Sequence, residues 1–162
     1  MNKTFKWVIL IIGGLVLFSF GLYKFSTLLP LGSYRYAQTY ELDFSEDRVI
    51  KSINKFKTDN PEFVVPKVTI NNSGSFDLPD ERKDNSDHWY HIYFYLKKEN
   101  VIIKAGTRPL TMNKTTFAFV SINKGLSIGN WQNINHDLSS NENDRFIQIF
   151  ETKILNPIQK TN

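Results

Sequence analysis

The chain has 162 residues, no cysteine and a formal net charge of +4. A chain without cysteine cannot form disulfides, bind zinc through thiolates or use a thiol nucleophile, so these classes of site are excluded. Of its 20 basic residues, Lys3, Lys6 and Lys24 flank an apolar run, which leaves 17 basic against 16 acidic residues in the rest of the chain. This balance does not fit a nucleic-acid-binding domain, which usually carries a basic surface.

The apolar run extends from Trp7 to Tyr23 and contains no charged residue. As a helix it would be about 26 Å long, close to the roughly 30 Å thickness of a bilayer core. Lys6 and Lys24 can extend their ammonium groups into the headgroup region at either end. We therefore expect residues 1–29 to form an uncleaved signal-anchor, with residues 7–23 crossing the membrane as a single transmembrane helix. A cleaved secretory signal is the alternative, although no Ala-x-Ala-like site follows the run.

The short N-terminal flank, with its free amine, favours an N-terminus in the cytoplasm. Residues 30–162 then form a single extracytoplasmic domain, in the periplasm or at the cell surface. Their length is sufficient for one hydrophobic core.

The domain begins with a predicted strand over residues 34–44, in which aromatic and apolar residues occupy even positions and polar residues occupy most odd ones. Ser45 is a candidate N-cap that could accept a hydrogen bond from the first turn of a helix. Val49, Ile53 and Phe56 recur at helical spacing, and Asn60-Pro61 should end this helix near Thr58.

A short β-rich run follows from Phe63 to Ile70, and Pro66 within it indicates an edge strand or a bulge. Residues 71–87 are rich in Asn, Ser, Gly, Asp and Pro, which predicts a long loop. Loops of this length are often functional.

Three strands are expected next, as an antiparallel meander. The strand over residues 88–96 should place Tyr90, Ile92, Phe94 and Leu96 on one face and Trp89, His91, Tyr93 and Tyr95 on the other. Residues 97–100 form a turn into a strand over 101–107, which Pro109 should close. In the next strand, 115–122, Phe117, Phe119 and Ser121 should lie opposite Ala118, Val120 and Ile122.

Ser140 can cap a final helix, whose apolar stripe comprises Phe146, Ile149, Phe150 and Ile154 and which Asn156-Pro157 should stop. Consecutive strands with helices before and after them predict an α+β fold. We expect a small antiparallel sheet of about four or five strands with two amphipathic helices packed on it.

No catalytic motif, metal site or cofactor site can be identified, and nothing in the sequence identifies an enzyme. His88 and His91 lie three residues apart on one strand, so they point to opposite faces and cannot share a metal. The loop acids Asp77, Asp80, Glu81, Asp84 and Asp87 lack the spacing of a calcium loop. A hydrolase that uses these carboxylates with His91 or His136 remains an alternative function, as does an envelope assembly subunit.

The row formed by Trp89, His91, Tyr93 and Tyr95 is the candidate partner-binding site. Tyr and Trp are enriched at recognition surfaces because they combine a large apolar area with a polar tip. Ordinary packing beneath the 71–87 loop or a helix is the competing interpretation. We therefore expect a membrane-anchored module that binds a protein, a peptide or an envelope component through this aromatic face, without nucleic acid.

Overall fold

The computed structural model describes residues 34–70, 74–84 and 86–161, and the predicted membrane span at residues 7–23 lies outside these ranges. The chain divides into two units after Arg35, and the elements below belong to the second, Tyr36–Asn162. None of the helices in the described ranges combines the length and apolar character needed to cross a bilayer.

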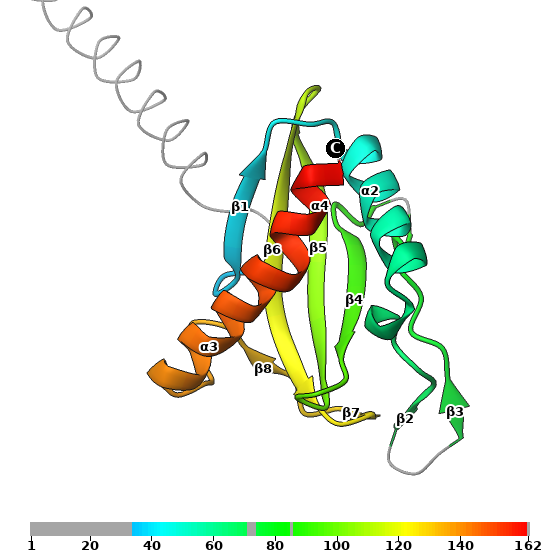
Figure 1. Ribbon diagram of the computed structural model, residues 1–162, viewed down its shortest axis with the longest axis vertical. Helices are drawn as coiled ribbons and strands as arrows, with labels where there is room; N and C mark the ends of the chain where they lie inside the picture. Colours follow the sequence, from blue (N-terminus) through cyan, green and yellow to red (C-terminus); the bar gives the residue numbers. More distant parts are fainter. Residues whose placement is uncertain (1–33, 71–73, 85, 162) are drawn as a thin grey trace, which may run out of the picture. The chain divides into compact units, whose positions relative to one another are not determined.

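A five-stranded antiparallel sheet forms the centre of the fold, which confirms the predicted α+β class (Figure 1). Its strand order is β1-β6-β5-β4, with β8 paired to part of β6. The strands are β1 (Gln38–Leu42), β4 (Tyr90–Leu96), β5 (Val101–Thr111), β6 (Lys114–Lys124) and β8 (Gln132–Asn133). Strand β4 therefore lies at one edge of the sheet.

The first helix, α2 (Glu46–Asp59), confirms the prediction to within one residue at its C-terminal end. Ser45 is its N-cap residue, but the expected side-chain capping bond is not formed. The Ser45 carbonyl instead accepts bonds from the N–H groups of Arg48 and Val49. After the helix, the predicted strand at residues 63–70 is replaced by the 3₁₀ turn η1 (Pro61–Phe63) and the short strand β2 (Val68–Ile70), which begins beyond Pro66. Proline has no N–H to contribute to a ladder, which explains the late start.

The second helix continues past Pro157, so the prediction that Asn156-Pro157 stops it is wrong. It comprises α3 (Ser140–Phe150), the π-helical turn η2 (Glu151–Leu155) and α4 (Asn156–Thr161). The Asn156 N–H donates to the Glu151 carbonyl, five residues back. In this wider turn, hydrogen bonds join residues five apart instead of four. Pro157 follows directly and lies in the first turn of α4, where a residue without an N–H is tolerated. The N-cap is Ser139 rather than Ser140.

Two irregularities in the β5–β6 hairpin overturn local predictions. Strand β5 continues through Pro109 to Thr111, because the proline lies beside a register shift near the hairpin tip, where a ladder bond can be omitted. A second shift pairs Lys104 with Ser121 but Ala105 with Phe119, leaving Val120 as the extra residue. This bulge changes the face of the following residues, so Ile122 joins Phe117 and Phe119 in one core instead of facing away from them.

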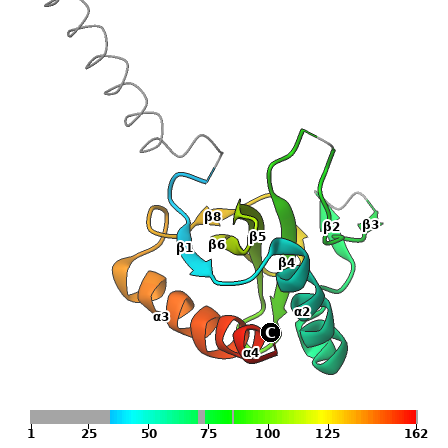
Figure 2. The same ribbon diagram turned by 90° about the horizontal axis from the view of Figure 1, so that it is seen from above.

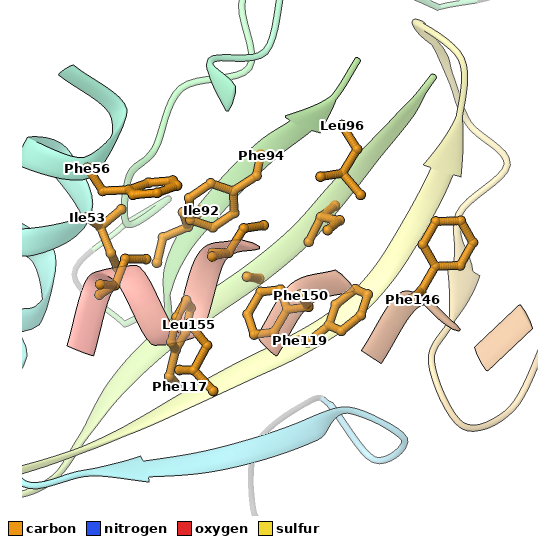
Figure 3. Packing of buried hydrophobic residues seen from close by; sticks show 14 of the residues in the cluster. Ile53, Phe56, Ile92, Phe94, Leu96, Phe117, Phe119, Phe146, Phe150 and Leu155 are labelled. Atoms are coloured by element: carbon orange, nitrogen blue, oxygen red, sulfur yellow. The ribbon is translucent and has the colours of Figure 1, made fainter. Parts of the chain in front are cut away.

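Both helices cover the same face of the sheet (Figure 2). Val49, Ile53 and Phe56 of α2 meet the second helix and the inward side chains of the strands in one buried cluster (Figure 3). Phe150 is fully buried, and its ring lies 4.7 Å from that of Phe119 and 5.8 Å from that of Tyr40, measured between centroids.

The opposite face of the sheet carries a smaller apolar cluster. Val68, Tyr93 and Ile102 are buried there, with Val65, Leu78, Tyr95, Leu126, Ile128 and Trp131 packed around them. Part of this cover is a second sheet, in the order β3-β2-β7, formed by β2, β3 (Ser75–Phe76) and β7 (Ser127–Ile128). The predicted 71–87 loop thus contains a short strand.

Candidate functional site

The structure places the predicted aromatic row on the face of β4 opposite the main core, but most of the row is covered. Trp89, His91 and Tyr93 are buried, with 3%, 6% and 8% of their surfaces exposed, while Tyr95 is half-buried. The Tyr93 ring lies 6.1 Å from that of Trp131, and the Arg108 guanidinium lies 4.9 Å above the Trp89 ring. The packing interpretation therefore describes the first three residues, and Tyr95 is the member that reaches the surface.

A short segment, residues 80–82, lies along the outer edge of β4, and we call it the strap. Glu81 and His91 form an antiparallel bridge. The Glu81 N–H donates to the His91 carbonyl at 3.1 Å, and the His91 N–H donates to the Glu81 carbonyl at 2.9 Å. His91 therefore directs its backbone groups outward, away from β5, and the strap satisfies them as a neighbouring strand would.

Two residues further along β4, side chains replace the missing strand. The Tyr93 N–H donates to Asp80 Oδ1 at 2.9 Å, and Lys57 Nζ donates to the Tyr93 carbonyl at 2.6 Å. The Lys57 ammonium also forms an ion pair with the Asp80 carboxylate. Burial lowers the pKa of Lys57, and the nearby charge of Asp80 offsets only part of this effect.

Further contacts tie the strap and the segment after it to the body of the domain. Arg82 forms an ion pair with Glu46 in the first turn of α2, and Glu46 also accepts a bond from the Thr107 hydroxyl at 3.1 Å. His91 Nε2 lies 2.7 Å from Asp87 Oδ2, and the Trp89 N–H donates to the other oxygen of Asp87. Although burial would raise the pKa of Asp87, the hydrogen bonds from Trp89 and His91 outweigh it and hold that pKa below its usual value.

The edge of β4 is open at Tyr95. Since backbone direction alternates along a strand, the N–H and carbonyl of Tyr95 point outward like those of His91 and Tyr93. No residue in the described ranges hydrogen-bonds to these two groups, whereas the Tyr95 hydroxyl donates to Asn100 Oδ1 at 2.9 Å. Within the part of the chain that the structure describes, no strand pairs with β4 on the side opposite β5 at this position.

A pocket of about 170 Å³ lies at this open end of β4. Its exposed lining surface is mainly apolar, although three lysines and two glutamates contribute to it. The lining residues are Glu62, Phe63, Tyr95, Leu96, Lys97, Lys98, Glu99 and Lys153. Glu99 also lines a second, wider hollow of about 390 Å³ with Asn100, Val101, Lys124, Gly125, Glu142, Arg145 and Phe146. Lys153 and Lys124 form ion pairs with Glu99 and Glu142. Among the other lining residues, Lys97, Lys98 and Arg145 outnumber Glu62, so the two linings together carry an excess of positive charge.

Of the histidines considered for a hydrolase, His91 lies beside one of the candidate loop acids, Asp87, whereas His136 lies beside Asp137, which is not one of them. His91 is paired with Asp87 beneath the surface, whereas His136 stacks on Tyr36 and contacts Asp137. Among the loop acids, Asp77 pairs with Lys67 and Asp80 with Lys57. Within the described ranges no group of three or more His, Asp or Glu residues is arranged to hold a metal ion.

Sequence reasoning missed Lys57 and Phe63 as residues of this site. Lys57 lies four residues after Ile53 in the sequence, so it borders the apolar stripe of α2. This spacing indicates a lysine whose methylene chain packs against the apolar stripe. No sequence pattern identifies Phe63 as a residue of the site, because the contact between η1 and β4 forms only in the folded chain.

The chain matches no family model, and neither the curated proteins nor the solved structures include one similar to it. The site must therefore be interpreted from its own geometry.

Proposed function

We propose that the protein is a membrane-anchored binding module that takes an extended peptide segment of a protein partner at the open edge of β4. The observation that carries this proposal is the outward-facing backbone of Tyr95 beside the pocket formed with Phe63 and Leu96. Residues 7–23 would hold the module in the membrane. The domain would face a protein or peptide of the cell envelope.

The proposed mode of binding is the addition of a strand. In this mode the main chain of the peptide pairs with a sheet edge, which supplies affinity, while pockets that take alternate side chains supply specificity. Here the Tyr95 N–H and carbonyl would make the backbone bonds. The pocket of about 170 Å³ would accept one apolar side chain against Phe63, Tyr95 and Leu96.

The aromatic row has a divided role in this proposal. Tyr95 would contact the peptide directly, whereas Trp89 and Tyr93 hold β4 in place by packing. His91 would act with them through its contact with Asp87. The proposal thus keeps Tyr95 of the site predicted from sequence as the contact residue and moves the site toward the C-terminal end of β4.

Selection from a library of displayed peptides against the full chain in detergent micelles tests this function. Selected peptides should then be resynthesised with a single N-methyl group at each position in turn. Because Tyr95 is the residue of this edge with an open N–H and carbonyl, one peptide residue should exchange both backbone bonds with it. N-methylation should therefore abolish binding at that one position and leave it nearly unchanged at the adjacent positions.

Two protein variants complete the experiment. Phe63→Ala should weaken binding because it removes one wall of the pocket, and Met112→Ala, at a side chain that is 91% exposed on the β5–β6 hairpin, should not. Equal sensitivity to N-methylation at every position, or binding that is indifferent to Phe63→Ala, would contradict strand addition at this edge.

A further inference from the structure

The outer edge of β4 presents three successive outward residues: His91, Tyr93 and Tyr95. The first two already have substitute partners, since the strap backbone pairs with His91 while Asp80 and Lys57 pair with Tyr93. The third is the site of the proposed function. An incoming strand longer than a few residues therefore meets the strap as soon as it extends past Tyr95.

We infer that the strap is an internal competitor for this edge, and that the partner is an acidic extended segment which displaces residues 80–82 and places a carboxylate on Lys57. This inference rests on the proposed function and specifies its partner. The incoming segment would pair with β4 from His91 to Tyr95. Its carboxylate would take the place of the Asp80 side chain.

The charge of Lys57 dictates the chemistry of the occupant. The Lys57 side chain is 13% exposed, and its ammonium lies between the Asp80 carboxylate, the Tyr93 carbonyl and the face of the Phe94 ring, 4.8 Å from the ring centroid. Removing the carboxylate from a covered ammonium leaves an uncompensated charge, which is strongly unfavourable. A segment that replaces the strap must therefore bring an Asp or Glu side chain to the same point.

The strap is held by contacts that a competing segment can reproduce. Within the described ranges, its backbone pairing with β4 consists of the single Glu81–His91 bridge, and the Glu81 side chain is exposed. Asp80 also forms the ion pair with Lys57, accepts a bond from the Tyr93 N–H at Oδ1, and accepts one from the Tyr90 hydroxyl at its carbonyl, at 2.8 Å. Arg82, which is one-third exposed, forms the ion pair with Glu46 and donates to the Asp87 carbonyl at 3.1 Å. An added acidic strand would replace the Glu81–His91 bridge and the carboxylate on Lys57, and would gain the open groups of Tyr95. Glu46, which loses Arg82 in this exchange, keeps its bond from the Thr107 hydroxyl.

The probe is a fluorescent heptapeptide with the sequence of residues 77–83, Asp-Leu-Pro-Asp-Glu-Arg-Lys, and a counterpart with asparagine in place of its central aspartate. Binding to the full chain in detergent micelles is measured by fluorescence anisotropy. Glu81→Pro removes the N–H that bonds to His91 and loosens the strap. Glu81→Ala is its matched control, because it removes only an exposed side chain and keeps that N–H.

We expect the acidic heptapeptide to bind Glu81→Pro about tenfold more tightly than it binds wild type or Glu81→Ala, which corresponds to the loss of roughly one backbone hydrogen bond from the competitor. The asparagine counterpart should bind Glu81→Pro about tenfold more weakly than the acidic one. If Glu81→Pro fails to fold, Asp80→Asn provides the same test. That variant keeps an oxygen for the Tyr93 N–H but leaves Lys57 without a carboxylate, so it too should prefer the acidic peptide over the neutral one.

Equal binding of the acidic and neutral peptides, or equal affinity of Glu81→Pro and Glu81→Ala, would overturn the inference. The proposed function fails separately. Library-selected peptides that are sensitive to N-methylation at one position on wild type, but bind Glu81→Pro no more tightly, would retain strand addition at Tyr95 and refute the competing strap. Equal sensitivity to N-methylation at every peptide position would refute both.

Discussion

Lys57 and Asp80 form an ion pair that also completes the edge of a sheet: each of the two side chains hydrogen-bonds to one backbone group of Tyr93. Lys57 comes from the last turns of α2 and Asp80 from the strap. Because 13% and 14% of the two side chains are exposed, neither charge is well hydrated. The pair thus joins a helix, a strand and a loop at one point.

The single replacements Lys57→Met and Asp80→Asn should each destabilise the domain by about 3 kcal/mol, because each leaves one covered charge without its partner. The double replacement should cost clearly less than the sum of the two, since it leaves neither charge behind. Urea denaturation of the four proteins gives the coupling free energy. Strictly additive losses would show that the pair does not act as a unit.

Tyr40 should make the domain sensitive to alkaline pH. Burial, followed by the hydrogen bond to Glu151 and its charge, raises the pKa of the Tyr40 hydroxyl above its ordinary value of 10.0. A raised pKa in the folded state means that this stabilising contribution is complete below pH 10 and is lost as the pH rises above it. The free energy of unfolding of wild type should therefore fall more steeply between pH 9.5 and pH 11, as approximate limits, than that of Tyr40→Phe.

Glu151→Gln separates the causes of this pH dependence. It removes the charge beside Tyr40 but leaves the burial, which is the largest cause. Its pH profile should lie between those of wild type and Tyr40→Phe. Identical profiles for wild type and Tyr40→Phe would exclude Tyr40 as the source.

Tyr93 and Tyr95 should respond differently to truncation, although they occupy the same face of β4. Tyr93→Ala removes a buried ring from the smaller core and should cost about 3–5 kcal/mol. Tyr95→Ala removes a half-buried ring that bonds to Asn100 and should cost about 1 kcal/mol. Melting curves of both variants, with peptide binding measured beside them, distinguish a packing residue from a contact residue. The assignment fails if Tyr95→Ala unfolds the domain.

Phe150 tests whether the second helix belongs to the core. Its ring is fully buried among Tyr40, Phe117 and Phe119, so Phe150→Ala should cost about 3–5 kcal/mol in the free energy of unfolding. Met112→Ala, at the exposed tip of the β5–β6 hairpin, is the control and should change it by less than about 0.5 kcal/mol. A loss below about 1 kcal/mol for Phe150→Ala would mark the helix as peripheral.

The predicted anchor gives a test in cells. If residues 7–23 cross the membrane, the protein should remain with membranes after carbonate extraction, and a reporter fused after Asn162 should be active only outside the cytoplasm. A shortened, freely soluble mature form would instead support a cleaved signal. Reporter activity inside the cell would reverse the orientation.

Local periodicity accounts for the parts of this fold that the sequence determined. The alternation in residues 34–44 and the helical spacing of Val49, Ile53 and Phe56 each reflect which side of one element is apolar, so the α+β class, α2 and the two faces of β4 could be read directly. The Asn60-Pro61 helix end is likewise a property of neighbouring residues.

Only the tertiary structure decided which faces of the strands and helices are covered, and where a helix or strand continues past a proline that should end it. Pro157 lies within a helix because Ile154, Leu155 and Ile158 all gain burial in the core, and a π-turn accommodates the ring. The bulge at Val120 depends on the register with β5, which no single strand specifies.

The candidate site is the part of the structure that local sequence patterns predict least well. Sequence placed Trp89, His91, Tyr93 and Tyr95 on one face of β4, but the burial of Tyr93 depends on Val68 and Trp131, which are distant in the chain. The strap reaches the same strand through the Glu81–His91 bridge and through the Asp80–Lys57 pair. Such contacts join residues that are distant in the chain, and their strength comes from burial and charge pairing that exist only after the chain has folded. The periodicity of a strand therefore determines the direction of a side chain, whereas its accessibility to a partner depends on what packs above it.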